Sequence, residues 1–156
     1  MEYTIKASRN NGLTAHHKNS IVFHSKYHGK LLKKNFIEIY DYHNERILTL
    51  KDHGILTNDF EIEDFTPSYY KEKPLLFGGY RNLELPCKNF LKIETPILPF
   101  GRFKIYFNNN VIASGKSKLF SIGINTITNF NTKNEYLIKY SLILLLIKYT
   151  ISYNDQ

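Results

Sequence analysis

The hydrophobic pattern of the chain changes once, near the C-terminus. Over most of the sequence, apolar and polar residues alternate in short runs between polar turns, which is typical of β-strands. Residues 135–153 instead form a long segment without Gly or Pro, and residues 142–147 are an unbroken aliphatic run. The few polar side chains of this segment do not gather on one side of a helical wheel. The pattern therefore predicts a helix that is buried on every side.

This apolar segment has three interpretations: a core helix, a membrane tail anchor or a pair of buried strands. A membrane span needs about 20 mostly apolar residues. Lys139 and Lys148 bracket a much shorter run, and a lysine in the middle of a bilayer is costly. We therefore expect residues 136–153 to form a helix in the protein core.

Short strands are predicted over the rest of the chain, from alternation or from β-branched and aromatic runs. They cover residues 3–6, 21–23, 36–40, 46–50, 60–63, 83–85, 91–94, 103–107, 111–114 and 120–124. Two hairpins are expected, one through residues 41–44 and one through a three-residue loop at 108–110. The second loop is Asn-Asn-Asn, and Asn tolerates the left-handed backbone that such a loop requires. Gly78 and Gly79 permit similar geometry.

So many strands followed by one apolar helix suggest a closed sheet. A sheet must hide its edges and its apolar face. A helix that is apolar all round covers a flat sheet poorly, because its outer face would stay wet, but it fits inside a barrel. Such a barrel needs more than the roughly eight strands whose interior side chains fill by themselves. The fold expected for residues 1–156 is one mainly β domain, a closed barrel that encloses the helix.

The last third of the chain carries the most specific order of elements. The sequence F-K-I-Y-F-N-N-N-V-I-A-S-G-K-S-K-L-F contains an edge hairpin with V-I-A-S-G-K at 111–116, and Y-L-I-K-Y-S-L-I-L-L-L-I follows. This order resembles the tubby C-terminal-like superfamily, which includes tubby proteins, LURP-one-related proteins, phospholipid scramblases and small bacterial relatives. The resemblance implies a twelve-stranded barrel around a central helix at 136–153.

The resemblance also implies a non-enzymatic role at membranes, because tubby domains bind phosphoinositides and scramblases act on phospholipids. The phosphoinositide ligands of tubby domains have no local match in this chain. The acidic calcium segment of scramblases is also missing, because residues 125–135 offer one carboxylate, Glu135, and calcium prefers several.

Charge and cysteine content limit the kinds of binding partner and the cellular compartment that we expect for the protein. The formal net charge is +7, which is consistent with nucleic acid or with an acidic membrane surface. The single cysteine, Cys87, excludes an internal disulfide and a Cys-rich zinc site. The N-terminus does not read as a signal peptide, so a cytoplasmic location is expected, with peripheral association with membranes.

Basic side chains near aromatic ones are the predicted ligand-binding positions. Lysine and arginine beside tyrosines such as Tyr69, Tyr70 and Tyr80 suit lipid headgroups, or phosphate contact combined with base stacking. Ordinary solvated lysines are the alternative interpretation. The candidates are Lys30, Lys33, Lys34, Lys71, Lys73, Arg81, Lys116 and Lys118.

Signals for catalysis or for a metal are weaker. His24 and His28 share a face, but no third ligand stands at a characteristic spacing. Residues 114–117 resemble the end of a phosphate-binding loop, yet Asn110 stands where that loop needs a glycine. We expect no catalytic residue, metal or cofactor. The favoured function is a non-enzymatic module that binds anionic phospholipid, ahead of a nucleic-acid-binding β protein and of a small enzyme.

Overall fold

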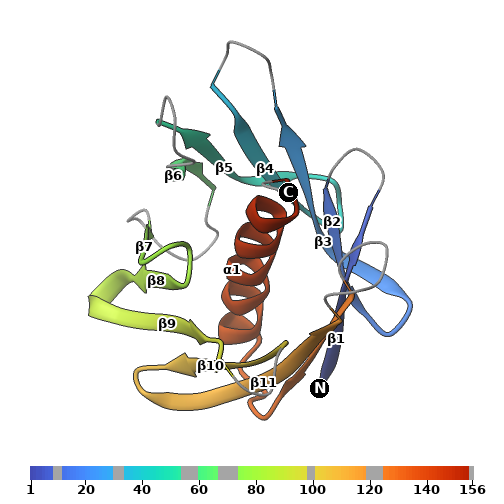
Figure 1. Cartoon of the computed structure of the whole chain (residues 1–156), viewed down its shortest axis with the longest axis vertical. Coiled ribbons are helices and arrows are strands. Elements are labelled where there is room, and N and C mark those ends of the chain that lie inside the picture. Colours follow the sequence, from blue (N-terminus) through green and yellow to red (C-terminus); the bar gives the residue numbers. More distant parts are fainter. Residues whose placement is uncertain are drawn as a thin grey trace.

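The computed structural model of the chain describes residues 1–8, 12–29, 34–53, 60–66, 74–97, 101–118 and 125–154. Twelve strands form one antiparallel sheet that curls into a nearly closed barrel, and a single helix runs through its middle (Figure 1). The strands are β1 (Glu2–Ala7), β2 (Leu13–His17), β3 (Ser20–His28), β4 (Phe36–Asp41), β5 (Arg46–Asp52), β6 (Phe60–Phe65), β7 (Leu75–Phe77), β8 (Asn82–Leu85), β9 (Asn89–Glu94), β10 (Arg102–Phe107), β11 (Asn110–Lys118) and β12 (Asn125–Phe130), and the helix is α1 (Glu135–Asn154). The prediction of a twelve-stranded barrel around a C-terminal helix is confirmed.

The sheet is a meander closed by its two terminal strands. Each strand pairs with its neighbours in sequence, except that β6 does not pair with β7, and β1 also pairs with β12, so the order runs from β6 through β1 and β12 to β7. The ends of this order meet at β6 and β7. There the Phe60 amide donates a hydrogen bond to the Tyr80 hydroxyl at 2.9 Å, and the two rings lie 6.3 Å apart edge to face. Tyr80 belongs to the turn between β7 and β8, so this contact fastens the seam of the barrel.

The helix is a core element, as its sequence predicts. Thirteen of its twenty residues are buried, including every residue from 140 to 147. By length and composition α1 is apolar enough to cross a membrane, but 72% of its most apolar window is buried inside the barrel. The Asn134 side chain caps its first turn by accepting hydrogen bonds from the Tyr136 and Leu137 amides at 3.1 and 3.3 Å.

Buried hydroxyls set how the helix is rotated inside the barrel. The Ser25 hydroxyl on β3 lies 2.6 Å from the Thr150 hydroxyl on α1 and accepts a hydrogen bond from the Leu13 amide at 2.9 Å. The Tyr149 hydroxyl bonds to Thr126 and Ser117, from β12 and β11. Buried polar groups need partners, so these contacts favour one rotation of an otherwise apolar rod.

Two details of the hairpin at 103–114 correct the sequence prediction. The turn has two residues, not three, because Phe107 pairs with Asn110, which begins β11. Asn108 and Asn109 have φ of 46° and 70°, the left-handed values that a two-residue hairpin turn demands. The hairpin is also interior and not at an edge, because β11 pairs with β12 on its other side.

Three strands, β2, β7 and β12, were not predicted. β12 was missed because two of its buried residues are Thr126 and Thr128, so its inward face does not read as apolar. Thr is nevertheless a good strand former. The strand predicted at 120–124 lies outside the described residues.

A first testable consequence concerns Tyr149 and alkaline pH. Burial raises the pKa of Tyr149 to about 12, compared with an ordinary tyrosine value of about 10. Between these values the unfolded chain loses the phenolic proton while the folded protein keeps it, so stability falls as pH rises. The loss is about 3 kcal/mol across that window. Tyr149→Phe should flatten the fall, as measured by urea unfolding from about pH 9 to about pH 12.

The same series separates the proton effect from the loss of the hydroxyl. Near pH 8 both states of the wild-type protein hold the phenolic proton, so any difference from Tyr149→Phe there reflects the hydrogen bonds to Thr126 and Ser117. An identical pH dependence in the two proteins would contradict the burial of this hydroxyl.

Candidate functional site

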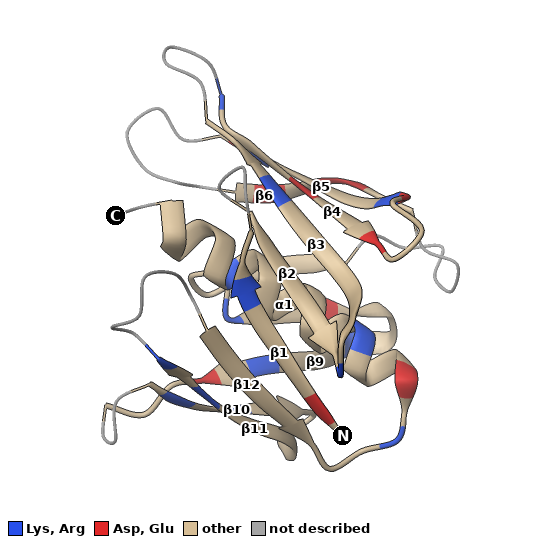
Figure 2. Cartoon of the chain, turned by 90° about the vertical axis from the view of Figure 1, so that its right-hand side faces the viewer, with Lys and Arg blue, Asp and Glu red and all other residues tan. Residues whose placement is uncertain are grey.

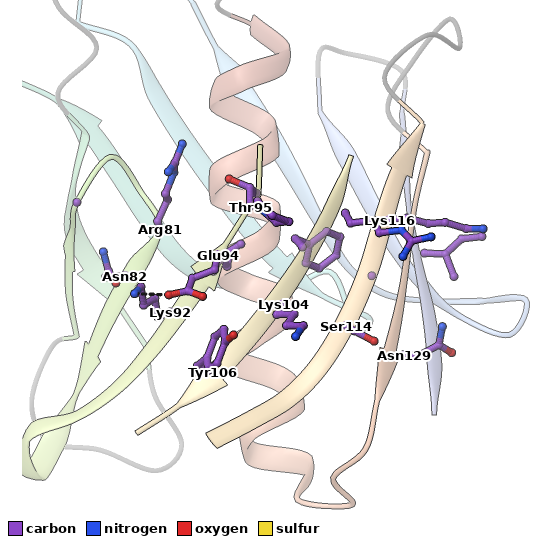
Figure 3. Close-up of a pocket in the computed structure, with 17 residues that line it drawn as sticks. Arg81, Asn82, Lys92, Glu94, Thr95, Lys104, Tyr106, Ser114, Lys116 and Asn129 are labelled. Carbon is purple, nitrogen blue, oxygen red and sulfur yellow. Dashed lines mark hydrogen bonds and ion pairs between the residues drawn. The ribbon is translucent and has the colours of Figure 1, made fainter. Parts of the chain in front are cut away.

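An open hollow of about 960 Å³ lies on the outer face of the barrel over β8 to β12 (Figure 3). We call it the basic groove. Five of the residues that line it are cationic, and only one is a carboxylate, Glu94. The cations are Arg81, Lys92, Arg102, Lys104 and Lys116, and all are exposed.

Strand alternation explains why these side chains point outward. On β9, Leu91 and Ile93 enter the core, so Lys92 and Glu94 face solvent. On β10, Phe103 and Ile105 enter the core, so the residues between and beside them face solvent. Pairing then brings the strands into register: Lys104 lies opposite both Glu94 and Ser114, and Arg102 lies opposite Lys116.

Most of the groove's positive charge is not neutralised within the groove. The Lys92 ammonium forms an ion pair with Glu94 at 2.5 Å, drawn in Figure 3, and the Tyr106 hydroxyl also donates to this carboxylate. These two hydrogen bonds hold the pKa of Glu94 below its ordinary value. In the described part of the chain, no ion pair is recorded for Arg102, Lys104 or Lys116.

The placement of Arg102 opposite Lys116 is unfavourable for the fold. Side chains directly across an antiparallel pair lie about 5 Å apart at Cβ, and like charges there are destabilising. Figure 2 shows basic positions on β9 and β10, whereas the carboxylates of β6 lie beside Arg46 and Lys51 of β5. An anion bound in the groove would relieve the repulsion between these cations.

The groove contains two of the eight predicted ligand-binding residues, Arg81 and Lys116. Lys118 lies two residues beyond Lys116 on β11, and Lys34 precedes β4 outside the groove. The other four, Lys30, Lys33, Lys71 and Lys73, lie outside the described residues.

Sequence reasoning missed Lys92, Arg102 and Lys104 as ligand-binding candidates. Lys92 and Lys104 each lie between inward apolar residues of a strand, which placed them on an outer face but said nothing about their neighbours. Only the register of β9 against β10 brings the three together.

The histidines predicted to share a face do so without gathering metal ligands. On the outside of β3 and β4, the His24 ring stacks on Tyr40 at 4.9 Å and the His28 ring stacks on Phe36 at 4.2 Å. His28 also lies 2.8 Å from the Glu38 carboxylate. Among the described residues, no three His, Cys, Asp or Glu side chains are grouped so that they could hold a metal ion.

Glu38 is the centre of that outer-face network. Burial alone would raise the pKa of Glu38, but hydrogen bonds from Tyr40, Arg46 and His28 outweigh burial and lower it. A carboxylate engaged by three donors is a structural crosslink between β3, β4 and β5.

The remaining sequence signals also have structural explanations. Gly115 of the S-G-K-S run lies in the middle of β11 and faces inward, where the Phe103 ring packs over it. Cys87 is exposed, in a short turn between β8 and β9 where its φ is 64°.

No protein-family model, curated protein or solved structure matches the chain. Its own geometry and charge therefore carry the evidence for a function.

Proposed function

We propose that the protein is a non-enzymatic binding module that holds the phosphate of an anionic phospholipid headgroup in the basic groove. The observation that carries the proposal is that Arg102, Lys104 and Lys116 line one hollow and that none of them forms an ion pair with another described residue. An arginine guanidinium binds phosphate oxygens with two parallel hydrogen bonds, and lysines add point charges.

A membrane surface fits the groove because it presents many anions at once. Each lysine or arginine close to an anionic leaflet contributes about 1 kcal/mol to binding. The net charge of +7 adds a weaker and less localised attraction. The resemblance to tubby-like proteins supports the same proposal, and with it a peripheral module on the cytoplasmic side of a membrane.

Charge reversal in the groove tests the proposal. The double variant Arg102→Glu, Lys116→Glu should bind vesicles of phosphatidylserine in phosphatidylcholine at least about 30-fold more weakly than the wild type, because two cations close to the surface are lost. Co-sedimentation at low salt measures this. The variant should fold, since both side chains are exposed and one like-charged pair across the strands replaces another.

A matched control makes the same change of net charge elsewhere. Lys18 and Lys133 are exposed and lie outside the groove, so Lys18→Glu, Lys133→Glu should weaken binding much less. Equal losses in the two double variants would show that binding follows overall charge and not the groove. A wild-type protein without preference for anionic over neutral vesicles would refute the phospholipid proposal itself.

A second candidate, binding of single-stranded nucleic acid, is favoured by one observation. The Tyr106 ring lies among the groove cations, where a base could stack on it while lysines contact phosphates. This candidate predicts oligonucleotide binding that weakens steeply with salt. If fluorescence anisotropy detects no oligonucleotide binding at low salt, this candidate is eliminated.

A further inference from the structure

Exposed apolar side chains lie beside the basic groove on β7 and β9. Leu75, Phe77 and Phe90 are 59%, 41% and 39% exposed. The Phe77 and Phe90 rings meet edge to face, with centroids 6.2 Å apart. Exposure of apolar side chains to water is unfavourable, and these three lie close together instead of singly over the barrel.

These rings and the groove form one continuous strip. A smaller hollow of about 320 Å³ is lined by Phe90 together with Asn82, Lys92 and Tyr106, and the last three also line the basic groove. Strand pairing also places these side chains in one row across the sheet. Phe77 on β7 pairs with Asn82 on β8, Asn82 pairs with Lys92 on β9, and Lys92 pairs with Tyr106 on β10.

The character of the strip changes along the strands. On the outer face of β10, Tyr106 is followed by Lys104 and then Arg102, at about 7 Å per step of two residues. On β9, Phe90 precedes Lys92 on the same face. The aromatic side chains therefore gather at one end of the strip, and the cations without ion pairs gather at the other.

We propose that this strip docks on an anionic lipid bilayer, with Leu75, Phe77 and Phe90 entering the interface while Lys104 and Arg102 hold headgroup phosphates. The inference rests on the proposed function and adds to it an orientation and an apolar contribution. The headgroup layer on each side of a bilayer is about 5 to 7 Å thick. Phe77 lies level with Tyr106, one step of about 7 Å from Lys104, so this ring and this cation reach their respective layers together.

Charge around the barrel supports a lipid surface and sets the tilt. The groove side carries an excess of cations, as an anionic leaflet requires, although Glu84 on β8 lies between Leu75 and Phe90. On β6, across the seam, the outward Glu63 and Asp64 form ion pairs with Lys51 and Arg46, so that side offers no excess of cations. The leaflet therefore attracts the groove side more strongly, and the barrel tilts onto β9 and β10.

Removing the rings tests the apolar part separately from the phosphate part. Phe77→Ser, Phe90→Ser should weaken binding to phosphatidylserine vesicles about tenfold, because two half-exposed rings no longer enter the interface. Binding of the soluble polyanion inositol hexakisphosphate, measured by calorimetry, should stay unchanged. The control Ile21→Ser, Tyr42→Ser removes two comparably exposed side chains from the other half of the sheet and should change neither.

Fluorescence gives a second readout that does not depend on the double variant folding. The chain has no tryptophan, so a single Phe90→Trp substitution gives an unambiguous probe. Its emission should shift to the blue on anionic vesicles and be quenched by brominated acyl chains. Tyr42→Trp should show neither effect.

The possible outcomes distinguish the two proposals. Vesicle binding with an unshifted emission from the Phe90→Trp variant overturns the docking surface and leaves the groove proposal standing. Loss of inositol hexakisphosphate binding in the double Ser variant also overturns it, because the rings would then belong to the anion site. Absence of any binding to vesicles and to the polyanion refutes both proposals. A change in the emission of the Phe90→Trp variant with oligonucleotides alone replaces them with nucleic-acid binding.

Discussion

Replacement of Leu144 by Asp should abolish the folded barrel. Leu144 lies at the middle of α1 and has no exposed surface. A carboxylate there would lose its water and find no cation, which costs several kcal/mol. A domain of this size has a total stability of about 5 to 15 kcal/mol. Circular dichroism and urea unfolding should show an unfolded or grossly destabilised chain.

A graded variant and a control on the same helix define the cause. Leu144→Ala should lower the free energy of unfolding by about 2 to 5 kcal/mol, through lost burial and the cavity left behind. Ser152→Asp adds the same charge to an exposed position of the last turn and should cost less than about 1 kcal/mol. If Leu144→Asp kept the stability of the wild type, α1 would not be enclosed.

Replacement of Gly12 by Ala should be strongly damaging for the addition of a single methyl group. A Cβ at this position would overlap the backbone carbonyl of Ser25, which is held in β3 and cannot move independently. The next residue, Leu13, donates its amide to the Ser25 hydroxyl that locates Thr150 of the helix. We expect a loss of about 3 kcal/mol in the free energy of unfolding, at the upper end for overpacking.

Gly79 provides the matched control for Gly12. Its φ is +66°, so alanine there is strained in its backbone, but nothing lies within 4 Å of the added Cβ. Gly79→Ala should therefore cost about 1 to 2 kcal/mol, from conformation alone. Urea unfolding of both variants compares the two effects. A smaller loss for Gly12→Ala than for Gly79→Ala would contradict the close approach of Gly12 to β3.

The fold was predictable in its main features because burial leaves a periodic trace in the sequence. Phe103, Ile105 and Phe107 share one face, and the structure buries the first two and packs the third against the core. β12 shows the limit, because Thr126 and Thr128 face the core without an apolar signature. In the sequence these threonines resemble polar loop residues. Only the structure shows that the Tyr149 hydroxyl bonds to Thr126 inside the barrel.

The candidate site was only partly predictable. Arg81 and Lys116 are predicted beside other basic residues, yet they are far apart in the sequence and line opposite sides of the groove. The unpredicted Lys92 and Lys104 complete the groove between them. Lysine is common on any solvated face, so composition cannot tell which lysines will converge.

The sequence by itself determined which side of each main strand is apolar and that residues 136–153 need an enclosure on all sides. These are local consequences of side-chain period and hydrophobicity, which any fold of this chain must satisfy. Tertiary structure alone decided that β1 pairs with β12, that the seam falls between β6 and β7, and that Arg102 lies opposite Lys116. Those features depend on strand register and closure, where a shift of one residue would turn every side chain to the other face of the sheet.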